Sequence, residues 1–441
     1  MHKIIVLILF VSLIFKTTNI YGQEVNIKLI DSLLTRIESK DKGMLSLSIS
    51  KDGKAVYSRA IGYSVKEAVK LSNTQTKYRI GSITKTFTAV LILQLIEENR
   101  LSLATNLARY FPSIPNASSI TIEQLLRHRT GIHNITDDES YLGYMTKGKT
   151  QDELIDIIKA QKPDFAPGSS FTYSNSGYIL LGFILEKIRG ESYDKILQKF
   201  IVNKLTNKDI YYGGKINPAN NEAKSYDKND GWMESTETDM SIPHGAGAIV
   251  ATPDALVGFL EELFKNKLVT SESVELMKEM KDNYGLGLFR MPFYDKFAFG
   301  HNGSIDGFGS SMAYFVEDKL AIALCTNAQD YEMNEILIVV LSACFDRPVD
   351  IPDFKEIKLE PEVLNLYIGD YTSKEMPIAI KVFEEKGVLK AQATGQGAFN
   401  LTPETEHVFS FKTAGIVISF DPLNKAMKLQ QGGRSFNFLR K

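Results

Sequence analysis

The sequence predicts an α/β (α+β) fold, in which an antiparallel sheet is flanked by helices and carries an inserted helical subdomain, followed by a small antiparallel β domain. Two observations lead to this expectation. A hairpin and a buried helix precede a helix-rich region, and strand-like segments then return ahead of a last helix. Beyond residue 354, short alternating segments are separated by turn residues at intervals of about ten residues.

The length and charge of the chain limit its organisation and its partners. A chain of 441 residues is too long for one compact core and favours two or three structural units. The formal net charge is -2, so the chain lacks the basic excess that binds nucleic acid. We therefore expect no nucleic-acid partner.

The amino-terminal residues have the pattern of a secretory signal peptide. His2 and Lys3 precede an apolar run from Ile4 to Phe15, and polar residues and the small residue Gly22 follow. The run is too short to span a bilayer, and no later segment is long and charge-free enough to do so. We expect an exported protein, periplasmic or secreted, without a membrane span after cleavage; an uncleaved anchor is the alternative.

Local patterns predict the elements of the first half. A short helix at 27–37 precedes a hairpin whose alternating strands flank Asp52 and Gly53, which favour a type I′ turn. The next helix runs from about Ser82 to Glu98 and would bury one face, formed by Phe87, Val90, Leu91 and Leu95. Residues 100–230 are expected to be mostly helical, with a capping box at Thr121 and Gln124.

Strand character returns in the second half. A helix over 252–264 begins with Thr252 and Pro253. Strands are predicted at 284–289, 297–303, 310–318 and 319–327, and a helix at 333–344. Cys325 and Cys344 lie in apolar runs and are expected to be buried free thiols, although they could pair in an oxidising compartment.

The expected domains follow from these patterns. They are a signal peptide at 1–22, a main domain at 23–346, a linker at 347–354 and a β domain at 355–441. The linker, DRPVDIPD, is rich in Pro and Asp, and the alternation beyond it is typical of an antiparallel barrel or sandwich.

Ser82 and Lys85 form the first chemically suggestive pair. Residues three apart share one face of a helix, so the Lys85 amine can reach the Ser82 hydroxyl. At the amino end of a helix, unpaired N–H groups and the macrodipole favour a developing negative charge. One interpretation is a nucleophile beside a proton acceptor, and the other is an N-cap serine with a solvated lysine.

Two later stretches supply further candidates. FTYSNSGY places Tyr173 and Asn175 two apart in an extended segment, where alternate side chains point the same way. GHNGSIDGFGSS, at 300–311, is a strand edge whose glycines allow a ligand to approach the backbone. Each fragment alone also fits a structural role. The chain has no G-x-S-x-G elbow, which argues against an α/β-hydrolase.

Together the three stretches resemble, in order and context, the penicillin-recognising serine hydrolases. The similarity is to the branch that contains class C β-lactamases, DD-carboxypeptidases, D-aminopeptidases and related esterases. It covers about residues 30–345 and includes the stretches LLRHRTGI, FAPGSSFTYSNSGYILLGFILE, GAGAIVATPDAL and YGLGLF. The resemblance implies a β-lactamase-like fold, and the tail is similar to the lipocalin-like β-barrel appended to some of these enzymes.

The resemblance also implies roles for residues of the first two stretches. Ser82 would be the acyl-accepting nucleophile, Lys85 would assist its deprotonation, and Tyr173 would act as general base and later as acid. Asn175 would orient the substrate amide. Tyrosine is a poor base unless its phenolate is stabilised, which a nearby Lys85 ammonium would do.

The third motif, KTG in many members, is matched by His301, Asn302 and Gly303. The backbone N–H groups of Ser82 and Ser304 would form the oxyanion hole, and Ser304 would lie along the substrate. His301 replaces a fixed cation by a mostly neutral ring, so recognition of a substrate carboxylate there should weaken. This departure lowers the expectation of a β-lactamase.

The remaining polar candidates carry less weight. His128 and His133 are five residues apart and do not share a helical face, so we expect a structural His128, no metal site and no cofactor. Asp306 could contact a substrate amine, but a loop turn is favoured.

The sequence thus predicts an exported serine hydrolase that cleaves a small amide or ester through a Ser82 acyl-enzyme. A D-amino-acid peptide is the leading substrate, as for a DD-carboxypeptidase or D-aminopeptidase, and the partner is a small molecule or short peptide. A carboxylesterase and a class C-like β-lactamase are the enzymatic alternatives. A non-catalytic binding protein for peptidoglycan fragments or β-lactams is the alternative from another class.

Overall fold

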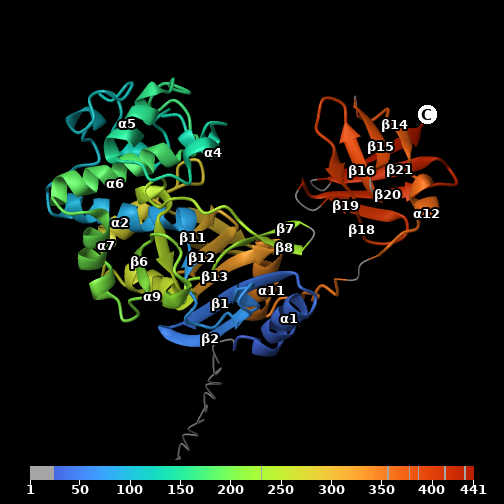
Figure 1. Ribbon diagram of the computed structural model, residues 1–441, viewed down its shortest axis with the longest axis horizontal. Coiled ribbons are helices and arrows are strands. Elements are labelled where there is room, and N and C mark those ends of the chain that lie inside the picture. Colours follow the sequence, from blue (N-terminus) through green and yellow to red (C-terminus); the bar gives the residue numbers. More distant parts are fainter. Residues whose placement is uncertain are drawn as a thin grey trace, which may run out of the picture. The chain divides into compact units, whose positions relative to one another are not determined.

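The computed structural model describes residues 24–229, 231–354, 357–376, 378–385, 387–411, 414–431 and 434–441 (Figure 1). The chain divides into two compact units, Met1–Pro352 and Asp353–Lys441. The division falls within the expected linker, 347–354. The expected signal peptide, 1–22, lies outside the described residues.

An eight-stranded sheet forms the centre of the first unit. Its main path is antiparallel, in the order β10 (Phe289–Phe293), β11 (Lys296–Ile305), β12 (Phe308–Phe315), β13 (Leu320–Gln329), β1 (Gly43–Lys51) and β2 (Lys54–Ile61). The other two strands, β7 (Tyr226–Asn229) and β8 (Gly231–Glu234), pair beside β13. Asp52 and Gly53 both have positive φ, as the predicted type I′ turn requires.

Helices cover both faces of this sheet. Tyr57 and Ser58 are consecutive on β2 and therefore point to opposite faces. The Tyr57 hydroxyl donates to Asp31 of α1 (Ile27–Ser39) over 2.7 Å, and the Ser58 hydroxyl donates to Asp254 of α9 (Pro253–Phe264) over 2.9 Å. Helix α11 (Met333–Phe345) packs on α1. The predicted helix-flanked antiparallel sheet is confirmed.

The inserted region lies between β2 and β10. Its helices are α2 (Thr84–Glu97), α3 (Ile122–Leu126), α4 (Tyr141–Tyr144), α5 (Gln151–Ala160), α6 (Asn175–Arg189), α7 (Tyr193–Phe200), α8 (His244–Gly247), α9 and α10 (Ser271–Lys278). Its 3-10 turns are η1 (Gly81–Ile83), η2 (Leu107–Arg109), η3 (Ile135–Asp137), η4 (Val202–Lys204) and η5 (Pro218–Asn220). Short strands form two small sheets, β3 (Tyr63–Val65) with β4 (Lys70–Leu71), and β5 (Tyr78–Arg79), β9 (Ile249–Ala251) and β6 (Ile210–Tyr212).

Local capping signals hold here, but two expectations for this region do not. The Thr121–Gln124 capping box and the Thr252 N-cap are both present. Residues 100–230 are less helical than expected, because turns and the strands β6 and β7 separate short helices. Helix α2 is buried on every side from Thr84 to Leu95, because it lies among α6, α7 and α8.

The segment 284–289 is not the predicted strand. It forms bends, and β10 begins only at Phe289. Gly287 has a φ of +75°, and a Cβ atom there would lie 3.0 Å from the Lys85 carbonyl oxygen. The segment therefore turns where it passes α2, which alternation of apolar residues does not reveal.

The second unit contains a nearly closed barrel of nine antiparallel strands after α12 (Pro361–Asn365). In sheet order they are β17 (Phe399–Asn400), β16 (Val388–Ala393), β15 (Ala379–Glu385), β14 (Gly369–Thr372), β22 (Arg434–Arg440), β21 (Ala426–Gln431), β20 (Ile416–Asp421), β19 (Val408–Phe411) and β18 (Thr402–Pro403). The edge strands β17 and β18 are joined by Leu401, so the two edges meet in sequence. The unit has its own apolar core, and the predicted antiparallel barrel is confirmed.

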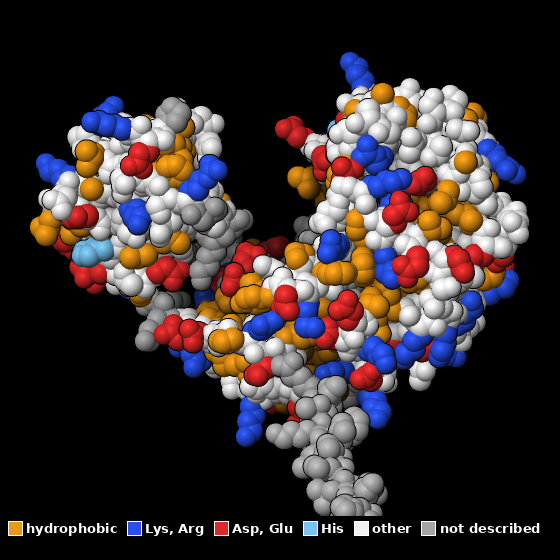
Figure 2. All heavy atoms as spheres, turned by 180° about the vertical axis from the view of Figure 1, so that it is seen from behind, with side chains coloured by type: hydrophobic (Ala, Val, Ile, Leu, Met, Phe, Trp, Pro, Cys, Tyr) orange, Lys and Arg blue, Asp and Glu red, His pale blue; other side chains and the backbone are white. Residues whose placement is uncertain are grey.

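Cys325 and Cys344 are buried and free. Basic and acidic side chains are interspersed over the face seen in Figure 2. Within the described ranges, no helix has the length and apolar character needed to cross a bilayer.

Candidate active site

Ser82 and Lys85 lie at the start of α2. Neither has the structural role that was the alternative to catalysis, an N-cap for Ser82 and a solvated side chain for Lys85. Ser82 belongs to the 3-10 turn η1, and the N-cap position of α2 is Ile83. The Lys85 side chain is fully buried. Ser82 is therefore not an N-cap, and Lys85 is not a solvated lysine.

The Lys85 amine has three hydrogen-bond partners. Nζ lies 3.0 Å from Ser82 Oγ, 2.7 Å from Asn175 Oδ1 and 2.9 Å from the Ala246 carbonyl oxygen. Burial lowers the pKa of Lys85 well below its usual range, because the charged form loses its hydration. This pKa direction favours a neutral amine held against the serine.

A neutral amine in this place has one possible arrangement. It can donate two hydrogen bonds and must direct its lone pair at the third partner. The Asn175 and Ala246 oxygens can only accept, whereas the Ser82 hydroxyl can donate. The lone pair of Lys85 therefore points at the Ser82 proton.

Tyr173 lies beside this pair. The Lys85 Nζ atom is 4.8 Å from the centroid of the Tyr173 ring. The Tyr173 hydroxyl is buried and has no hydrogen-bond partner of normal geometry among the described residues. Burial raises the pKa of Tyr173, and the nearby Ser82 hydroxyl only partly opposes this shift. A phenolate at Tyr173 is thus disfavoured relative to a neutral Lys85.

Asn175 begins α6 and is held from three directions. Its backbone N–H donates to Asn134 Oδ1 over 2.9 Å, and its Nδ2 donates to Thr136 Oγ1 over 2.9 Å. Its Oδ1 accepts from Lys85. These contacts fix the orientation of the Asn175 side-chain amide, with its oxygen directed at Lys85.

The third stretch meets η1 through backbone atoms. The β10–β11 ladder ends at the pair Phe289–Gly300, so the following residues of β11 have no strand partner on that side. A Cβ atom on Gly303 would lie 2.0 Å from the Ile80 carbonyl oxygen. A Cβ atom on Gly81 would lie 2.7 Å from the Ser304 carbonyl oxygen. The free edge of β11 at Gly303 and Ser304 thus packs directly on the turn that carries Ser82.

His301 points from β11 into the buried site. Its Nδ1 lies 2.5 Å from the Asn302 carbonyl oxygen, so Nδ1 must carry the proton. Its Nε2 lies 3.2 Å from the Tyr284 hydroxyl and therefore accepts from it. Burial lowers the pKa of His301 to about 3, so the ring is neutral at physiological pH.

The structure adds aromatic residues that the sequence analysis did not assign to the site. The Tyr173 ring packs 4.2 Å from the ring of His128 and 6.4 Å from that of Phe289. His128 Nδ1 accepts from the Ser174 N–H over 3.1 Å. The expectation of a packing role for His128 holds, although it lies directly beside the candidate site. Tyr284 and Phe289 lie in the stretch YGLGLF that contributes to the family resemblance, but their contacts with Tyr173 and His301 are long-range and no local pattern assigned them to the site.

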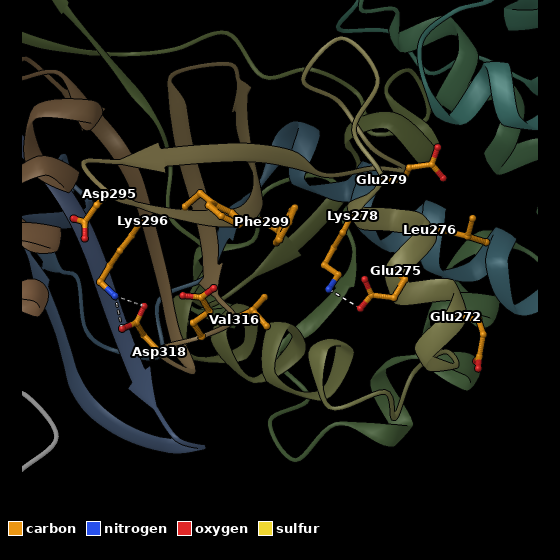
Figure 3. Close-up of a pocket in the computed structure, with 12 residues that line it drawn as sticks. Glu272, Glu275, Leu276, Lys278, Glu279, Asp295, Lys296, Phe299, Val316 and Asp318 are labelled. Carbon is orange, nitrogen blue, oxygen red and sulfur yellow. Dashed lines mark hydrogen bonds and ion pairs between the residues drawn. The ribbon is translucent and has the colours of Figure 1, made fainter. Parts of the chain in front are cut away.

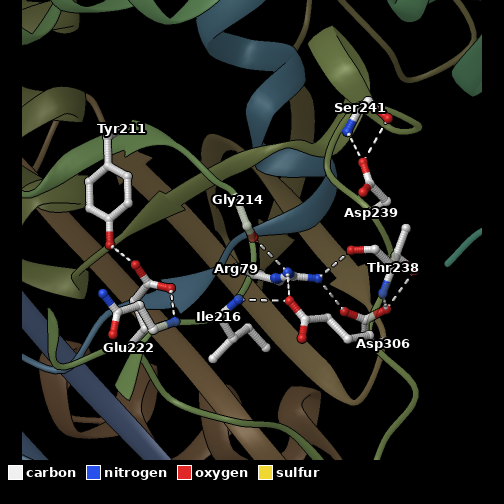
Figure 4. Close-up of polar contacts among 11 residues, drawn as sticks. Arg79, Tyr211, Gly214, Ile216, Glu222, Thr238, Asp239, Ser241 and Asp306 are labelled. Atoms are coloured by element: carbon white, nitrogen blue, oxygen red, sulfur yellow. Dashed lines mark hydrogen bonds and ion pairs between the residues drawn. The ribbon is translucent and has the colours of Figure 1, made fainter. Parts of the chain in front are cut away.

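A buried ion pair holds the strand before Ser82 (Figure 4). Arg79 Nη1 contacts Asp306 Oδ2 at 2.8 Å, and both side chains are almost fully buried. Arg79 also donates to Glu237 over 2.5 Å and to the Thr238 and Gly214 carbonyl oxygens. Asp306 therefore sits in the expected loop turn after β11, and its carboxylate is committed to Arg79.

A cavity of about 490 Å³ adjoins the opposite face of β11. Asn302 and Phe289 line it at the strand edge, and apolar residues of α11, including Leu337 and Leu341, line its far side. Asn302 is exposed. The cavity therefore offers an apolar space next to Asn302.

No group of three His, Cys, Asp or Glu side chains suited to a metal ion occurs in the part of the chain that the structure describes.

A family model described as Beta-lactamase matches residues 35–341. The chain belongs to the beta-lactamase family. It is a serine hydrolase of the beta-lactamase and penicillin-binding-protein family.

Two curated relatives are similar to this beta-lactamase family member over most of their own length. Penicillin-binding protein 4* of Bacillus subtilis is 23% identical over 433 residues, covering 89% of this chain and 93% of the relative. The putative penicillin-binding protein PbpX of the same organism is 26% identical over 297 residues, covering 64% and 70%.

Solved structures extend the family likeness. D-amino acid amidase from Ochrobactrum anthropi SV3, complexed with L-phenylalanine amide, is 27% identical with a TM-score of 0.64, covering 72% of this chain and 99% of that one. The octameric penicillin-binding protein homologue from Pyrococcus abyssi is 25% identical with a TM-score of 0.66, covering 93% and 99%.

Proposed function

We propose that this protein hydrolyses a small amide or ester through an acyl-enzyme on Ser82, with a D-amino-acid amide or peptide as the substrate class. The observation that carries the proposal is the arrangement of Lys85, whose neutral amine can take only the Ser82 proton. A serine hydroxyl is a weak nucleophile until such a base removes its proton.

Lys85 acts as the base in acylation. The pKa directions support Lys85 over Tyr173 in this role, since burial favours the uncharged form of both groups. Tyr173 then donates its hydroxyl proton to the leaving group and recovers it from Lys85. The Tyr173 hydroxyl has no hydrogen-bond partner of normal geometry among the described residues, which supports this exchange.

The backbone N–H groups of Ser82 and Ser304 stabilise the oxyanion. The packing of Gly303 and Ser304 on Ile80 and Gly81 supports this assignment, because it brings the two backbones together. Donors held in advance for a developing charge each contribute about 3 to 4 kcal/mol to catalysis.

Three observations support the substrate class. His301 is neutral, so no fixed cation stands at the third motif to bind a carboxylate. The apolar cavity beside Asn302 can accept a bulky apolar substituent. D-amino acid amidase, whose structure was solved with phenylalanine ligands, is among the similar structures. In this proposal the substrate amide is held by Asn302 and by the second N–H of Asn175 Nδ2, since the first donates to Thr136.

The first experiment asks whether Ser82 is a nucleophile. The protein is treated with a fluorophosphonate probe and digested, and the adduct is located by mass spectrometry with Ser82→Ala as control. We expect an adduct on Ser82 alone. Its absence would favour the binding-protein alternative.

The second experiment ranks the substrates. Turnover is measured on D- and L-phenylalanine amide, D-alanyl peptides, p-nitrophenyl esters and nitrocefin. We expect the D-amide or D-peptide to be preferred over its L counterpart. Faster ester turnover would identify a carboxylesterase, and comparable nitrocefin turnover would identify a class C-like β-lactamase.

We also propose that residues 1–22 direct export to the periplasm or the medium and that the hydrolase domain, 23–346, and the barrel, 355–441, are separate domains. The charge and apolar pattern of residues 1–22 supports export. Sequencing the amino terminus of the protein from a fractionated culture tests this, and an intact Met1 in the cytoplasmic fraction would contradict it.

A further inference from the structure

A large groove of the first unit lies away from Ser82. Its volume is about 1010 Å³, and none of the candidate site residues lines it. One wall is α10 with Glu279, and the other comprises the β10–β11 turn, the first residues of β11 and the β12–β13 turn. The established activity gives this groove no role.

The floor of the groove is apolar. Phe297 and Val316 are 38% and 37% exposed, which is high for such side chains, and Leu276 and Phe299 lie beside them. Phe264 stacks on Tyr314 behind Phe299 and keeps the floor in place. Exposed apolar surface inside a groove marks an interaction site more often than scattered exposed residues do.

The rim is strongly acidic. It has two lysines and six carboxylates: Glu272, Glu275, Glu279, Asp295, Glu317 and Asp318. Both lysines are already paired, Lys278 with Glu275 at 2.6 Å and Lys296 with Asp318 at 2.7 Å. The groove therefore offers uncompensated negative charge.

Arginines outside the groove neutralise only some of these carboxylates. Glu279 lies 3.8 Å from Arg127, and Asp295 pairs with Arg347. Glu272 and Glu317 have no ion pair among the described residues, and they stand on opposite walls. In Figure 3, Glu272 and Glu275 lie toward one end, Asp295 and Asp318 toward the other, and Phe299 and Val316 between them.

We propose that this groove binds a short cationic peptide segment of a partner protein, with basic residues on both sides of an apolar side chain. The apolar side chain contacts the Phe297–Val316 floor, and the basic residues meet the carboxylates at the two ends. A small organic cation would leave one end uncompensated, whereas an extended peptide advances about 3.3 Å per residue and reaches both. Opposite charge also accelerates association.

The test uses the full chain and a fluorescent six-residue peptide with two lysines on each side of a Phe-Leu pair. We expect saturable binding by fluorescence anisotropy that weakens as salt increases. The Glu272→Lys, Glu317→Lys double variant should weaken binding at least tenfold. Asp152→Lys, Asp227→Lys is the matched control, because it changes two exposed carboxylates outside the groove and should leave binding within about twofold.

The apolar part of the proposal has its own variant and its own control peptide. Phe297→Ser keeps every charge and should weaken binding at least fivefold. A peptide with Ser-Gly in place of Phe-Leu should bind at least fivefold more weakly to the unmodified protein. Fluorophosphonate labelling of Ser82 reports that each variant is folded, so failure of this proposal is distinguishable from failure of the proposed hydrolase function.

Several outcomes would overturn the proposal. Equal weakening by the two double variants would mean general charge attraction only. Equal binding of the Ser-Gly peptide would mean that the apolar floor does not contribute to peptide binding. Complete competition by spermine at equal affinity would identify a small cation as the ligand. Self-association of the unmodified protein that the Glu272→Lys, Glu317→Lys variant abolishes would identify a second copy of the chain as the occupant.

Discussion

Gly303 lies so close to Ile80 that a Cβ atom on the glycine would come within 2.0 Å of the Ile80 carbonyl oxygen. The adjoining contact between Gly81 and Ser304 has the same character. Ser310 supports this approach, since its hydroxyl donates to the Ile80 carbonyl oxygen over 2.8 Å. The edge of β11 and the turn of Ser82 are therefore one unit, and the absence of a side chain at Gly303 permits it.

Gly303→Ala should separate the two backbones. We expect turnover to fall about 100-fold, the cost of losing one oxyanion donor, and the free energy of unfolding to fall by about 1 to 3 kcal/mol through the forced shift. Steady-state kinetics and denaturant unfolding measure the two effects. Gly258→Ala, on α9 in open space, is the control and should leave both unchanged or slightly raise stability. Unchanged turnover of Gly303→Ala would contradict the proposal that β11 contributes a donor to the oxyanion hole.

The pH profile of kcat/KM should report Lys85. Its pKa is lowered by burial, and the neutral form is the base, so activity should rise with pH and reach its plateau well below the ordinary lysine pKa of about 10.4. Lys85→Met should lower activity by about 10² to 10⁴-fold. Lys54→Met, at an exposed position, is the control. An acid limb at pH 10 would mean that Lys85 is charged in the free enzyme and is not the base.

Tyr173→Phe should separate catalysis from stability. The hydroxyl is buried without a partner of normal geometry, so its removal should leave the free energy of unfolding unchanged or raise it by up to about 1 kcal/mol. Turnover should fall by about 10² to 10⁴-fold, because the proton route to the leaving group is lost. A variant that is active but unstable would assign Tyr173 to packing alone.

Asp306→Ala should destabilise the hydrolase domain by about 3 to 5 kcal/mol, because it leaves the buried Arg79 short of a partner. Glu237 remains near Arg79 and should keep the loss toward the lower figure. Asp156→Ala breaks an exposed pair with Lys159 and should cost at most about 1 kcal/mol. Denaturant unfolding of both variants gives the comparison, and equal losses would contradict the role of the Arg79–Asp306 pair.

Deletion of residues 355–441 should leave fluorophosphonate labelling of Ser82 intact. Each unit has its own apolar core, so the first unit should fold without the barrel. Labelling rate and thermal unfolding of the truncated protein are the measurements. Loss of labelling in a folded truncated protein would assign the barrel a part in the active site.

Short-range sequence patterns correctly predicted several local features of the fold. The Asp52–Gly53 turn, the Thr121–Gln124 capping box and the Thr252–Pro253 helix start depend on residues within four positions of one another, and all three are present. The segment 284–289 was predicted wrongly because its bends follow from contact with α2, far away in sequence. Burial of α2 on all sides also depends on helices that sequence periodicity cannot place.

Residue types and short spacings in the sequence predicted the helix-flanked sheet and the terminal barrel. The resemblance of its motifs to a known family supplied the set of residues proposed for catalysis. Only the tertiary structure decided their chemistry. It buried Lys85 against two oxygens that cannot donate and left the Tyr173 hydroxyl without a partner of normal geometry among the described residues. It also made His301 neutral through burial, with Nε2 accepting from the Tyr284 hydroxyl. Protonation depends on what surrounds a group in space, and those neighbours lie up to 161 residues apart along the chain.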